Sequence, residues 1–450
     1  MIVDAYTPQS GDARIRIQHY ELTLDYKVTT NRLSGTAELR GRATEDTRSI
    51  ALDLVGLRAT RARVAGDAAA SFRQSDRKLK ISLGAPLAAG DEFTVIIAYA
   101  GAPRPRRTRW GTIGWEELED GVLVASQPTG APTWFPCNDV PSDKATYRIE
   151  FATDAAYTVV AGGLVSCVPS RGKRVWTFER DVPTATYLVT LQVGRYTQES
   201  HEFGSTRGEL YFPKPLAARV RSDFSPVGDM MTVFEESFGA YPFAEYAVVV
   251  TADDLEIPLE AQGMAIFGAN HIDGHGGLER LVAHELAHQW FGNSVGVAQW
   301  RDIWLNEGFA CYAEWIWSER SGGPSAHAKA LGHHAALARE PQDLLTGDPG
   351  AELMFDDRVY KRGALTLHAV RLTVGDDAFF RILREWTVRH RGGTVVTTDF
   401  VVLADAVSGV ALGGLFHAWL DELPLPALPA SGRTDAPAPV TAAMGLRQRN

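Results

Sequence analysis

The sequence predicts a multidomain α+β protein, in which an antiparallel β domain is followed by a mostly helical domain. The chain has 450 residues, which is enough for two or three domains. Apolar and polar residues alternate through roughly the first 200 residues, and this is the period of half-buried strands. From about residue 209 the apolar residues recur at helical spacing instead.

The β domain is expected over residues 1–203. Its clearest strand signals are two runs in which every second residue is apolar or aromatic, at 20–28 and 93–99. Clusters of Gly, Pro, Asp and Ser separate further short strands, which are expected at 146–152, 157–160, 175–178 and 187–193. Strands punctuated in this way are typical of antiparallel sheets that pack on each other.

The helical domain is expected over residues 204–422. It begins with a short strand at 246–251 and a glycine-rich loop. Helical periodicity then recurs in five segments, at 303–320, 325–339, 358–374, 377–390 and 412–420. The tail, 423–450, is rich in Pro and Ala and is expected to be partly disordered.

Composition excludes several classes of protein. The formal net charge of −10 argues against a general nucleic-acid binder. The three cysteines, Cys137, Cys167 and Cys311, include no C-x-x-C pair, so neither a disulfide framework nor a thiolate metal site is expected. The first twenty residues lack a signal-peptide pattern, and no apolar run is long enough to cross a bilayer. We therefore expect a cytoplasmic protein with no nucleic-acid or membrane partner.

The run from His284 to His288 reads H-E-x-x-H and carries the strongest chemical signal. Two histidines four residues apart lie on one face of a helix, so both imidazoles can reach one zinc ion. Glu285 then projects beside the metal, where a general base is needed. Glu307 follows His288 by nineteen positions, far enough for a second helix to return a carboxylate to the same ion. This pattern predicts one zinc ion per chain, with a position left for water.

The alternative interpretation is a core helix whose histidines only form hydrogen bonds. An apolar face at helical spacing, which any buried helix needs, is formed by Leu281, Val282, Leu286, Ala287 and Trp290. Because a third possible ligand, the carboxylate of Glu307, is present as well, the metal site is favoured.

Several motifs together resemble the zinc aminopeptidases of the aminopeptidase N type, a gluzincin family. Residues 135–145 are similar to the family pattern F-P-C-x-D-x-P-x-x-K-A. Tyr187-Leu188-Val189 and Val193-Gly194 resemble the end of its first domain. The runs 284–290 and 304–310 are nearly identical to family sequence, and the resemblance extends from near residue 19 to near residue 419.

The resemblance implies a saddle-like β domain on a thermolysin-like catalytic domain. It also implies that His284, His288 and Glu307 bind zinc and that Glu285 is the general base. Tyr360 lies in a segment that fits the family pattern Y-x-x-G-A, which carries a catalytic tyrosine. Most relatives have a long helical domain after the catalytic one, and this chain is expected to be a short form without it.

Recognition of a free peptide N-terminus is the finer function that the resemblance implies. The family motif G-A-M-E-N is absent, and Ile257-Pro258-Leu259-Glu260-Ala261 takes its place, with Gly263 as the downstream glycine. Glu260 then supplies the carboxylate that binds the substrate ammonium.

Further site residues complete the expected site. Gln127, ten positions before Cys137, is a second candidate for binding the substrate amine. Glu314, seven positions after Glu307, is expected to accept a hydrogen bond from a metal-binding histidine. Asp302 is a further candidate for that role.

The expected activity is aminopeptidase hydrolysis of peptides that have a free N-terminus. An endopeptidase with the same zinc site remains an alternative, because the G-A-M-E-N segment is altered. A catalytically inactive binding relative is a third interpretation, and a lipid-epoxide hydrolase would rest on analogy alone. Oligomeric state and side-chain preference are not predicted.

Overall fold

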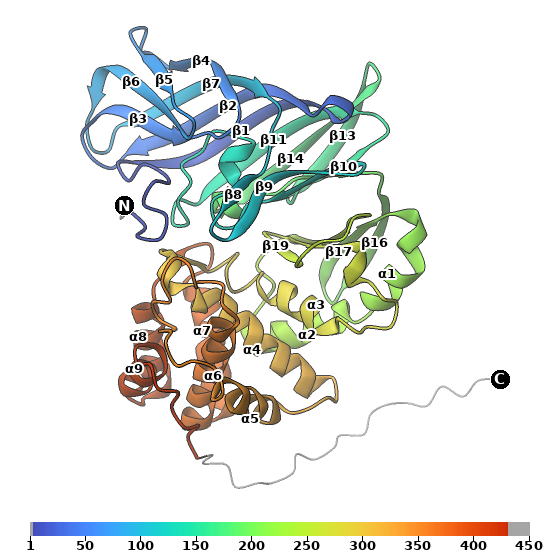
Figure 1. Ribbon diagram of the computed structural model, residues 1–450, viewed down its shortest axis with the longest axis vertical. Helices are drawn as coiled ribbons and strands as arrows, with labels where there is room; N and C mark the ends of the chain where they lie inside the picture. Colours follow the sequence, from blue (N-terminus) through green and yellow to red (C-terminus); the bar gives the residue numbers. More distant parts are fainter. Residues whose placement is uncertain (1–2, 431–450) are drawn as a thin grey trace, which may run out of the picture.

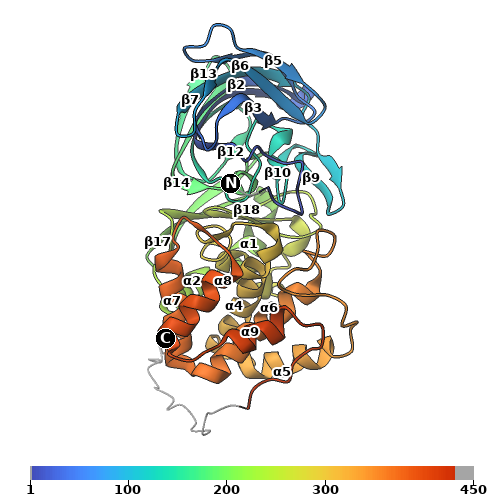
Figure 2. The same ribbon diagram turned by 90° about the vertical axis from the view of Figure 1, so that its left-hand side faces the viewer.

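Sheets of β-strands lie above a helical domain in the computed structural model, which describes residues 3–430 (Figure 1). The view turned by 90° shows the same separation, with the first strands at one end and helices α4 to α9 at the other (Figure 2). An N-terminal β-rich domain followed by a mostly helical domain is the order predicted from the sequence, and that prediction is confirmed.

In the described part of the chain, the largest sheet has seven strands. Its centre is the hairpin of β1 (Ile15–Lys27) and β2 (Arg32–Ala43). A bulge between Ile17 and His19 shifts the alternation by one residue, so that the following apolar residues still point inward. The order across the sheet is β13 (Leu164–Ser170), β14 (Lys173–Thr184), β11 (Ala145–Asp154), β1, β2, β7 (Glu92–Gly101) and β4 (Arg58–Val64).

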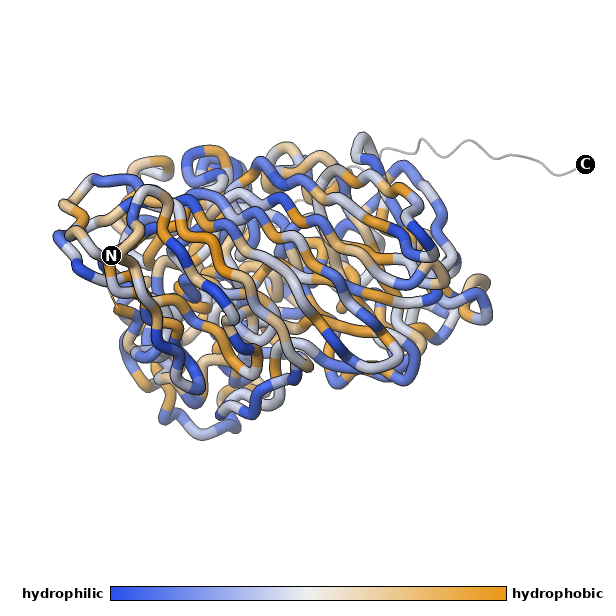
Figure 3. Tube along the Cα trace, turned by 90° about the horizontal axis from the view of Figure 1, so that it is seen from above, coloured by the Kyte–Doolittle hydropathy of each residue, from blue (hydrophilic) through white to orange (hydrophobic). Residues whose placement is uncertain are grey.

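This sheet is not wholly antiparallel, as the sequence had led us to expect, because β1 and β11 run parallel. Alternation of apolar residues reveals which face of a strand is buried but not the direction of its neighbour. Figure 3 shows hydrophilic and hydrophobic residues following one another along the strands of this layer. Beneath the sheet, the rings of Tyr20 and Tyr147 stack with centroids 4.9 Å apart.

Two smaller sheets complete the first domain. One lies against the helical domain and contains β12 (Thr158–Val160), β15 (Gln192–Gly194), β10 (Gly121–Ala125), β9 (Gly111–Leu118) and β8 (Arg106–Thr108). The other contains β3 (Thr47–Asp53), β6 (Lys78–Leu87) and β5 (Ser71–Gln74). The strand predicted at 187–193 is mostly wrong, because a 3₁₀ turn at Thr186–Leu188 precedes β15. Residues 186–194 are all buried, so alternation carried no information there.

Within residues 3–430, the second domain begins with a five-stranded sheet, of which the sequence predicted only the strand at 246–251. Its order is β16 (Thr197–Phe203), β17 (Thr206–Phe212), β18 (Glu245–Val250), β20 (Met264–Phe267) and β19 (Leu259–Ala261). β17, β18 and β20 run parallel, and β18 and β20 are almost entirely buried, so they lack a polar face. The proposed domain boundary at 203/204 passes through the β16–β17 hairpin, and this pairing joins β16 to the second domain.

Helices fill the rest of the domain, with α4 at its centre, buried from Trp304 through Trp317. Five predicted helices match α4 (Trp304–Arg320), α5 (Ala326–Leu337), α6 (Asp357–Val374), α7 (Asp376–Arg389) and α9 (Gly413–Leu420) within two residues at each end. The helix of the H-E-x-x-H run is α3 (Glu279–Ala287). The sequence did not reveal α1 (Ala217–Asp223), α2 (Val227–Phe238), α8 (Thr397–Ser408) or the short pair β21 (Gly296–Val297) and β22 (Thr394–Val395).

None of the helices in the described residues has the length and apolar content needed to span a bilayer. After α9 the chain continues without regular structure to residue 430. Arg362 holds this segment by donating to the carbonyl oxygens of Trp419 and Leu423, 2.7 and 2.8 Å away. The remainder of the predicted disordered tail, 431–450, lies outside the described residues.

Candidate active site

The three predicted metal ligands meet between α3 and α4. His284 projects from the last turn of α3, His288 directly follows the end of this helix, and Glu307 comes from the first turn of α4. Nε2 of His284 lies 3.5 Å from Oε2 of Glu307, and Nε2 of His288 lies 3.3 Å from the same oxygen. One donor atom from each residue lies within 4.8 Å of the other two, and all three residues are buried. We call these residues the metal cluster.

The far side of each imidazole is held by an acceptor. Nδ1 of His284 lies 2.8 Å from Oε1 of Glu314, and Nδ1 of His288 lies 3.0 Å from the carbonyl oxygen of Phe291. With a proton on each Nδ1, the lone pair of each Nε2 faces the centre of the metal cluster. Arg280 fixes Glu314 in turn, donating to both of its carboxylate oxygens at 3.1 and 3.0 Å.

The prediction for Asp302 needs correction. Its carboxylate accepts hydrogen bonds from the N–H and the hydroxyl of Thr397, at 3.1 and 2.7 Å. Thr397 is the first residue of α8, where an acidic acceptor satisfies a free N–H and the helix dipole. No hydrogen bond within residues 3–430 joins Asp302 to either histidine, so this aspartate anchors a helix.

Glu285 and Glu260 form a second acidic group beside the metal cluster. Their carboxylate oxygens and one nitrogen of His288 lie within 4.8 Å of one another. Glu260 comes from β19, the edge strand of the sheet, whereas Glu285 comes from α3. In the described part of the structure Oε2 of Glu285 is buried without a hydrogen-bond partner. A carboxylate oxygen in this state needs a proton donor or a cation nearby.

The charges of these residues fit a metal ion. Burial alone would lower the pKa of His284, but hydrogen bonds with Glu307 and Glu314 raise that pKa to about 9. Burial would raise the pKa of Glu307, but His288 and His284 lower it to about 2. The buried carboxylates thus need positive charge at the centre of the metal cluster, and a metal ion bound there would supply it. Two imidazole nitrogens and one carboxylate oxygen are also a donor set that zinc prefers, so the residues fit a zinc ion.

Tyr360 reaches the site from α6. Its ring lies 6.0 Å from the ring of His284, nearly parallel to it. Burial and the negative charges of Glu307, Glu260 and Glu285 raise the pKa of its phenol well above the usual value. The phenol therefore keeps its proton and remains a hydrogen-bond donor beside the metal cluster.

Gln127, the second predicted amine-binding residue, has an amide nitrogen without a partner in the described structure. It follows β10, and its Nε2 is buried without a hydrogen-bond partner among the described residues. An unpaired amide that is held in this way can still orient a ligand through its nitrogen or its oxygen. The structure gives no contact that joins Gln127 to Glu260.

Gly263, the predicted substrate-binding glycine, has hydrogen bonds to the protein from both of its backbone groups. Gly263 lies in the turn between β19 and β20 with a φ of +73°, a conformation that favours glycine. Its N–H donates to Oε1 of Gln289 at 2.8 Å, and its carbonyl oxygen accepts from the N–H of Ala247 at 2.9 Å. Both backbone groups are therefore engaged by the protein itself.

Sequence reasoning missed residues that support the site from behind. Gln289, next to His288, donates from Nε2 to the carbonyl oxygens of Ala261 and Met264, at 3.1 and 3.3 Å. This amide links α3 to the hairpin that carries Glu260. Its position directly after the H-E-x-x-H run was a usable signal. The carbonyl oxygen of Phe291 could not be predicted from the sequence, because every residue has a backbone carbonyl.

Comparison with known proteins agrees with this geometry. Residues 224–419 match the family described as the peptidase family M1 domain, and residues 17–188 match the peptidase M1 N-terminal domain. A curated relative, the leucyl aminopeptidase of Saccharolobus solfataricus, is 25% identical over 412 residues. That match covers 82% of this chain but 48% of the relative, so the chain spans about half of the relative's length.

Solved structures match over nearly their whole length. A crystal structure of an M1 zinc metallopeptidase from Deinococcus radiodurans, a Glu-to-Ala mutant bound to a Tyr-Ser-Ala substrate, has a TM-score of 0.88 and 31% sequence identity. The match covers 95% of this chain and 99% of the chain in the crystal structure. A structure described as a two-domain M1 zinc metallopeptidase mutant bound to L-tryptophan has a TM-score of 0.86, with the same identity and coverage.

Proposed function

This chain belongs to the peptidase family M1, and from that premise we propose that it is a zinc aminopeptidase that removes the first residue of peptides. The observation that carries the proposal is the position of Glu260. Its carboxylate lies within 4.8 Å of Glu285 and His288 but belongs to the edge strand β19 and not to the metal cluster. A carboxylate at the border of a hydrolytic site can bind the ammonium of a peptide N-terminus.

His284, His288 and Glu307 are the proposed zinc ligands. When bound there, zinc acts as a Lewis acid that acidifies a water and polarises a carbonyl. Glu314 and the Phe291 carbonyl keep the two imidazoles oriented through their Nδ1 atoms.

Glu285 is the proposed general base. Its Oε2 is buried and has no hydrogen-bond partner in the part of the protein that is described, so it is available to accept a proton from the attacking water. The same carboxylic acid can then return that proton to the leaving amine. Such proton transfers contribute on the order of 10² to 10⁴ in rate.

Tyr360 is the proposed donor to the oxyanion that develops on the substrate carbonyl. The support is its protonated phenol beside the metal cluster and its nearly parallel packing against His284. A fixed donor in a site without bulk water stabilises such a charge by about 3–4 kcal/mol. Gln127, with its unpaired Nε2, is proposed to assist Glu260 in binding the substrate N-terminus.

Peptides that differ only at the N-terminus test the proposal. We expect a free-amine tripeptide amide to be cleaved at its first bond at least about a hundredfold faster than its N-acetyl form, because only the free amine pairs with Glu260. Equal rates would instead support an endopeptidase. The exposed Ile257 and the proline after it, which lacks an N–H, give that alternative its basis.

A cytoplasmic location is also part of the proposal. Cys137 and Cys311 are buried thiols, and Cys167 is an exposed one. None of them forms a disulfide within the described residues, which is the usual state of cysteines in a reducing compartment. Localisation of a tagged full-length chain in its host would test this part.

A further inference from the structure

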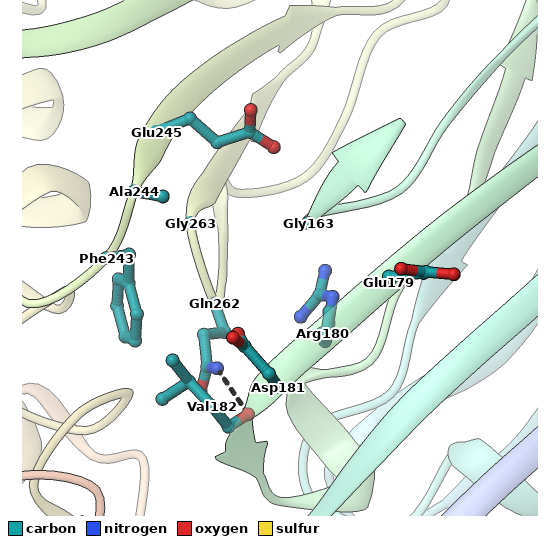
Figure 4. Close-up of a pocket in the computed structure, with 10 residues that line it drawn as sticks. All are labelled: Gly163, Glu179, Arg180, Asp181, Val182, Phe243, Ala244, Glu245, Gln262 and Gly263. Atoms are coloured by element: carbon teal, nitrogen blue, oxygen red, sulfur yellow. Dashed lines mark hydrogen bonds between the residues drawn. The ribbon is translucent and has the colours of Figure 1, made fainter. Parts of the chain in front are cut away.

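Apart from the candidate active site, a pocket lies where the two domains meet, around the turn between β19 and β20 (Figure 4). Its volume is about 130 Å³, and it has no residue of the metal cluster in its wall. One water takes about 10–15 Å³ of such space, so a molecule of roughly ten heavy atoms fits. Clefts between domains are common ligand sites. We call it the junction pocket, lined by Gly163, Glu179, Arg180, Asp181, Val182, Phe243, Ala244, Glu245, Gln262 and Gly263.

Arg180 contributes hydrogen-bond donors that the protein leaves unused. The residue is 5% exposed, and its Nε donates to the carbonyl oxygen of Gly162 at 2.5 Å. Nη1 and Nη2 are both buried and have no hydrogen-bond partner among residues 3–430. Figure 4 shows the guanidinium directed toward the middle of the junction pocket. Burial lowers the pKa of Arg180 to about 10, so the group is still a cation at neutral pH. A buried cation with free N–H groups calls for an anionic acceptor.

Other residues of the wall offer hydrogen-bond acceptors. Oε1 of Gln262 is buried without a hydrogen-bond partner in the described structure, while its Nε2 donates to the carbonyl oxygen of Val182 at 3.3 Å. The carboxylate of Glu245 lies across the pocket from Arg180 (Figure 4). Burial raises the pKa of Glu245, and the charges of Arg207 and Arg180 lower it. The pocket therefore presents unused donors of Arg180, an unused acceptor of Gln262, and a carboxylate across from Arg180.

This distribution of charge argues against a simple anion. An inorganic anion placed at Arg180 would face the carboxylate of Glu245 and leave Oε1 of Gln262 unpaired. A simple cation would leave Nη1 and Nη2 of Arg180 unpaired. Glu179, also in the wall, is engaged on its outer side by Arg148, whose Nε lies 3.5 Å from Oε1 of Glu179. A ligand with both charges can pair with Nη1 and Nη2 of Arg180 and with Oε1 of Gln262 at the same time.

We propose that the junction pocket binds a small zwitterion, namely a free α-amino acid, with its carboxylate on Arg180 and its ammonium between Glu245 and Gln262. The available volume suits a small residue such as alanine, and Phe243 and Val182 offer apolar contact to its side chain. This binding does not depend on the proposed peptidase activity.

The test measures how many equivalents of free amino acid bind at the junction pocket, separately from any that bind elsewhere. Ala244 is exposed and lines the junction pocket, so Ala244→Trp fills the space without changing the core. Ala218→Trp is the matched control, since Ala218 is exposed on α1 and does not line the pocket. Equilibrium dialysis of the full-length, zinc-loaded chain against isotopically labelled L-alanine measures equivalents bound. Any alanine held at the metal cluster is present in every variant and cancels from the difference.

The proposal expects the wild type and Ala218→Trp to bind one more equivalent than Ala244→Trp. Equal binding by all three would overturn it. Acetate and ethylamine, which each carry one of the two charges, are expected to displace this alanine at least about tenfold more weakly than unlabelled L-alanine does. Displacement by acetate alone at the same strength would contradict the zwitterion and indicate a simple carboxylate site.

Two further variants locate the charges. Arg180→Gln and Glu245→Gln are each expected to weaken the binding at this pocket at least about tenfold, because each removes one charge-assisted contact. Circular dichroism of each variant checks that it is folded. If both fold and both bind L-alanine as the wild type does, the assignment of the two charged groups is wrong.

Discussion

Gly308 of α4 and Gly363 of α6 touch through their backbones. A Cβ atom placed on Gly308 would lie 2.9 Å from the Cα of Gly363, and the reverse distance is also 2.9 Å. Gly308 follows Glu307 directly, and Gly363 lies one helical turn after Tyr360. This contact brings the helix of Glu307, a proposed zinc ligand, against the helix of Tyr360, the proposed oxyanion donor.

Gly308→Ala is expected to lower both stability and turnover. Its methyl group meets backbone, which cannot move aside as a side chain can, so α6 must shift away and take Tyr360 with it. Overpacking of this kind costs about 1–3 kcal/mol, and urea unfolding measures it. Gly332→Ala on α5 is the control. Nothing lies within 4 Å of its Cβ position, so it is expected to stabilise by about 0.5–1 kcal/mol. Equal effects of the two changes would contradict the close contact.

Glu314→Ala is expected to weaken zinc binding by about 10–100-fold, because Nδ1 of His284 loses the acceptor that orients the ring. Competition with a chelating dye measures this affinity. Glu314→Gln keeps an acceptor oxygen, so it should recover part of the loss. If Glu314→Ala binds zinc as tightly as the wild type, Glu314 does not position the ring.

Glu260→Ala is expected to raise the KM for free-amine peptides by at least about tenfold, since a charge-assisted contact of about 1.5–3 kcal/mol is removed. Cleavage of the N-acetyl peptide and zinc content should change little, because Glu260 is outside the metal cluster. Glu256→Ala, on the exposed segment before β19, is the matched control. Unchanged kinetics in Glu260→Ala would assign the ammonium to another acid.

His368 should make the fold sensitive to acid. Burial, with the charges of Arg371 and His327, lowers the pKa of His368 from 6.5 to about 3. Between pH 6.5 and 3, His368 is therefore protonated in the unfolded chain but not in the folded chain. Stability is fully present above pH 6.5 and falls as the pH falls, by at most about 1.4 kcal/mol per pH unit from this group.

His368→Asn is expected to flatten this slope of the unfolding free energy in urea titrations across that range. The variant His275→Asn, on an exposed loop, is the comparison. A wild-type slope that persists unchanged in His368→Asn would show that other groups cause the acid sensitivity.

Much of the fold could be predicted because its signals are local. Helices α5 and α7 have one buried face, and apolar periodicity placed them within two residues at each end. β18 and β20 are almost entirely buried, so their sequences contain no alternation to indicate that they lie side by side. The parallel pairing of β1 with β11 depends on contacts across more than a hundred residues, which no local pattern records.

The residues of the candidate site also fall into those that the sequence could predict and those that it could not. His284, His288 and Glu307 could be predicted because side-chain type and spacing indicate the metal site, whereas Glu260 was predicted from the resemblance of its segment to the family motif G-A-M-E-N. Asp302 was misjudged because its partner, Thr397, is distant in sequence. The junction pocket had no sequence signal, since Arg180 and Gln262 belong to different domains.

The central claim is that His284, His288 and Glu307 together hold one zinc ion. Zinc content per chain, measured by atomic emission after exhaustive dialysis, tests it most directly. We expect about one zinc in the wild type and in Glu285→Gln, which keeps every ligand, and close to none in Glu307→Ala. A full equivalent of zinc in Glu307→Ala, or none in the wild type, would contradict the account.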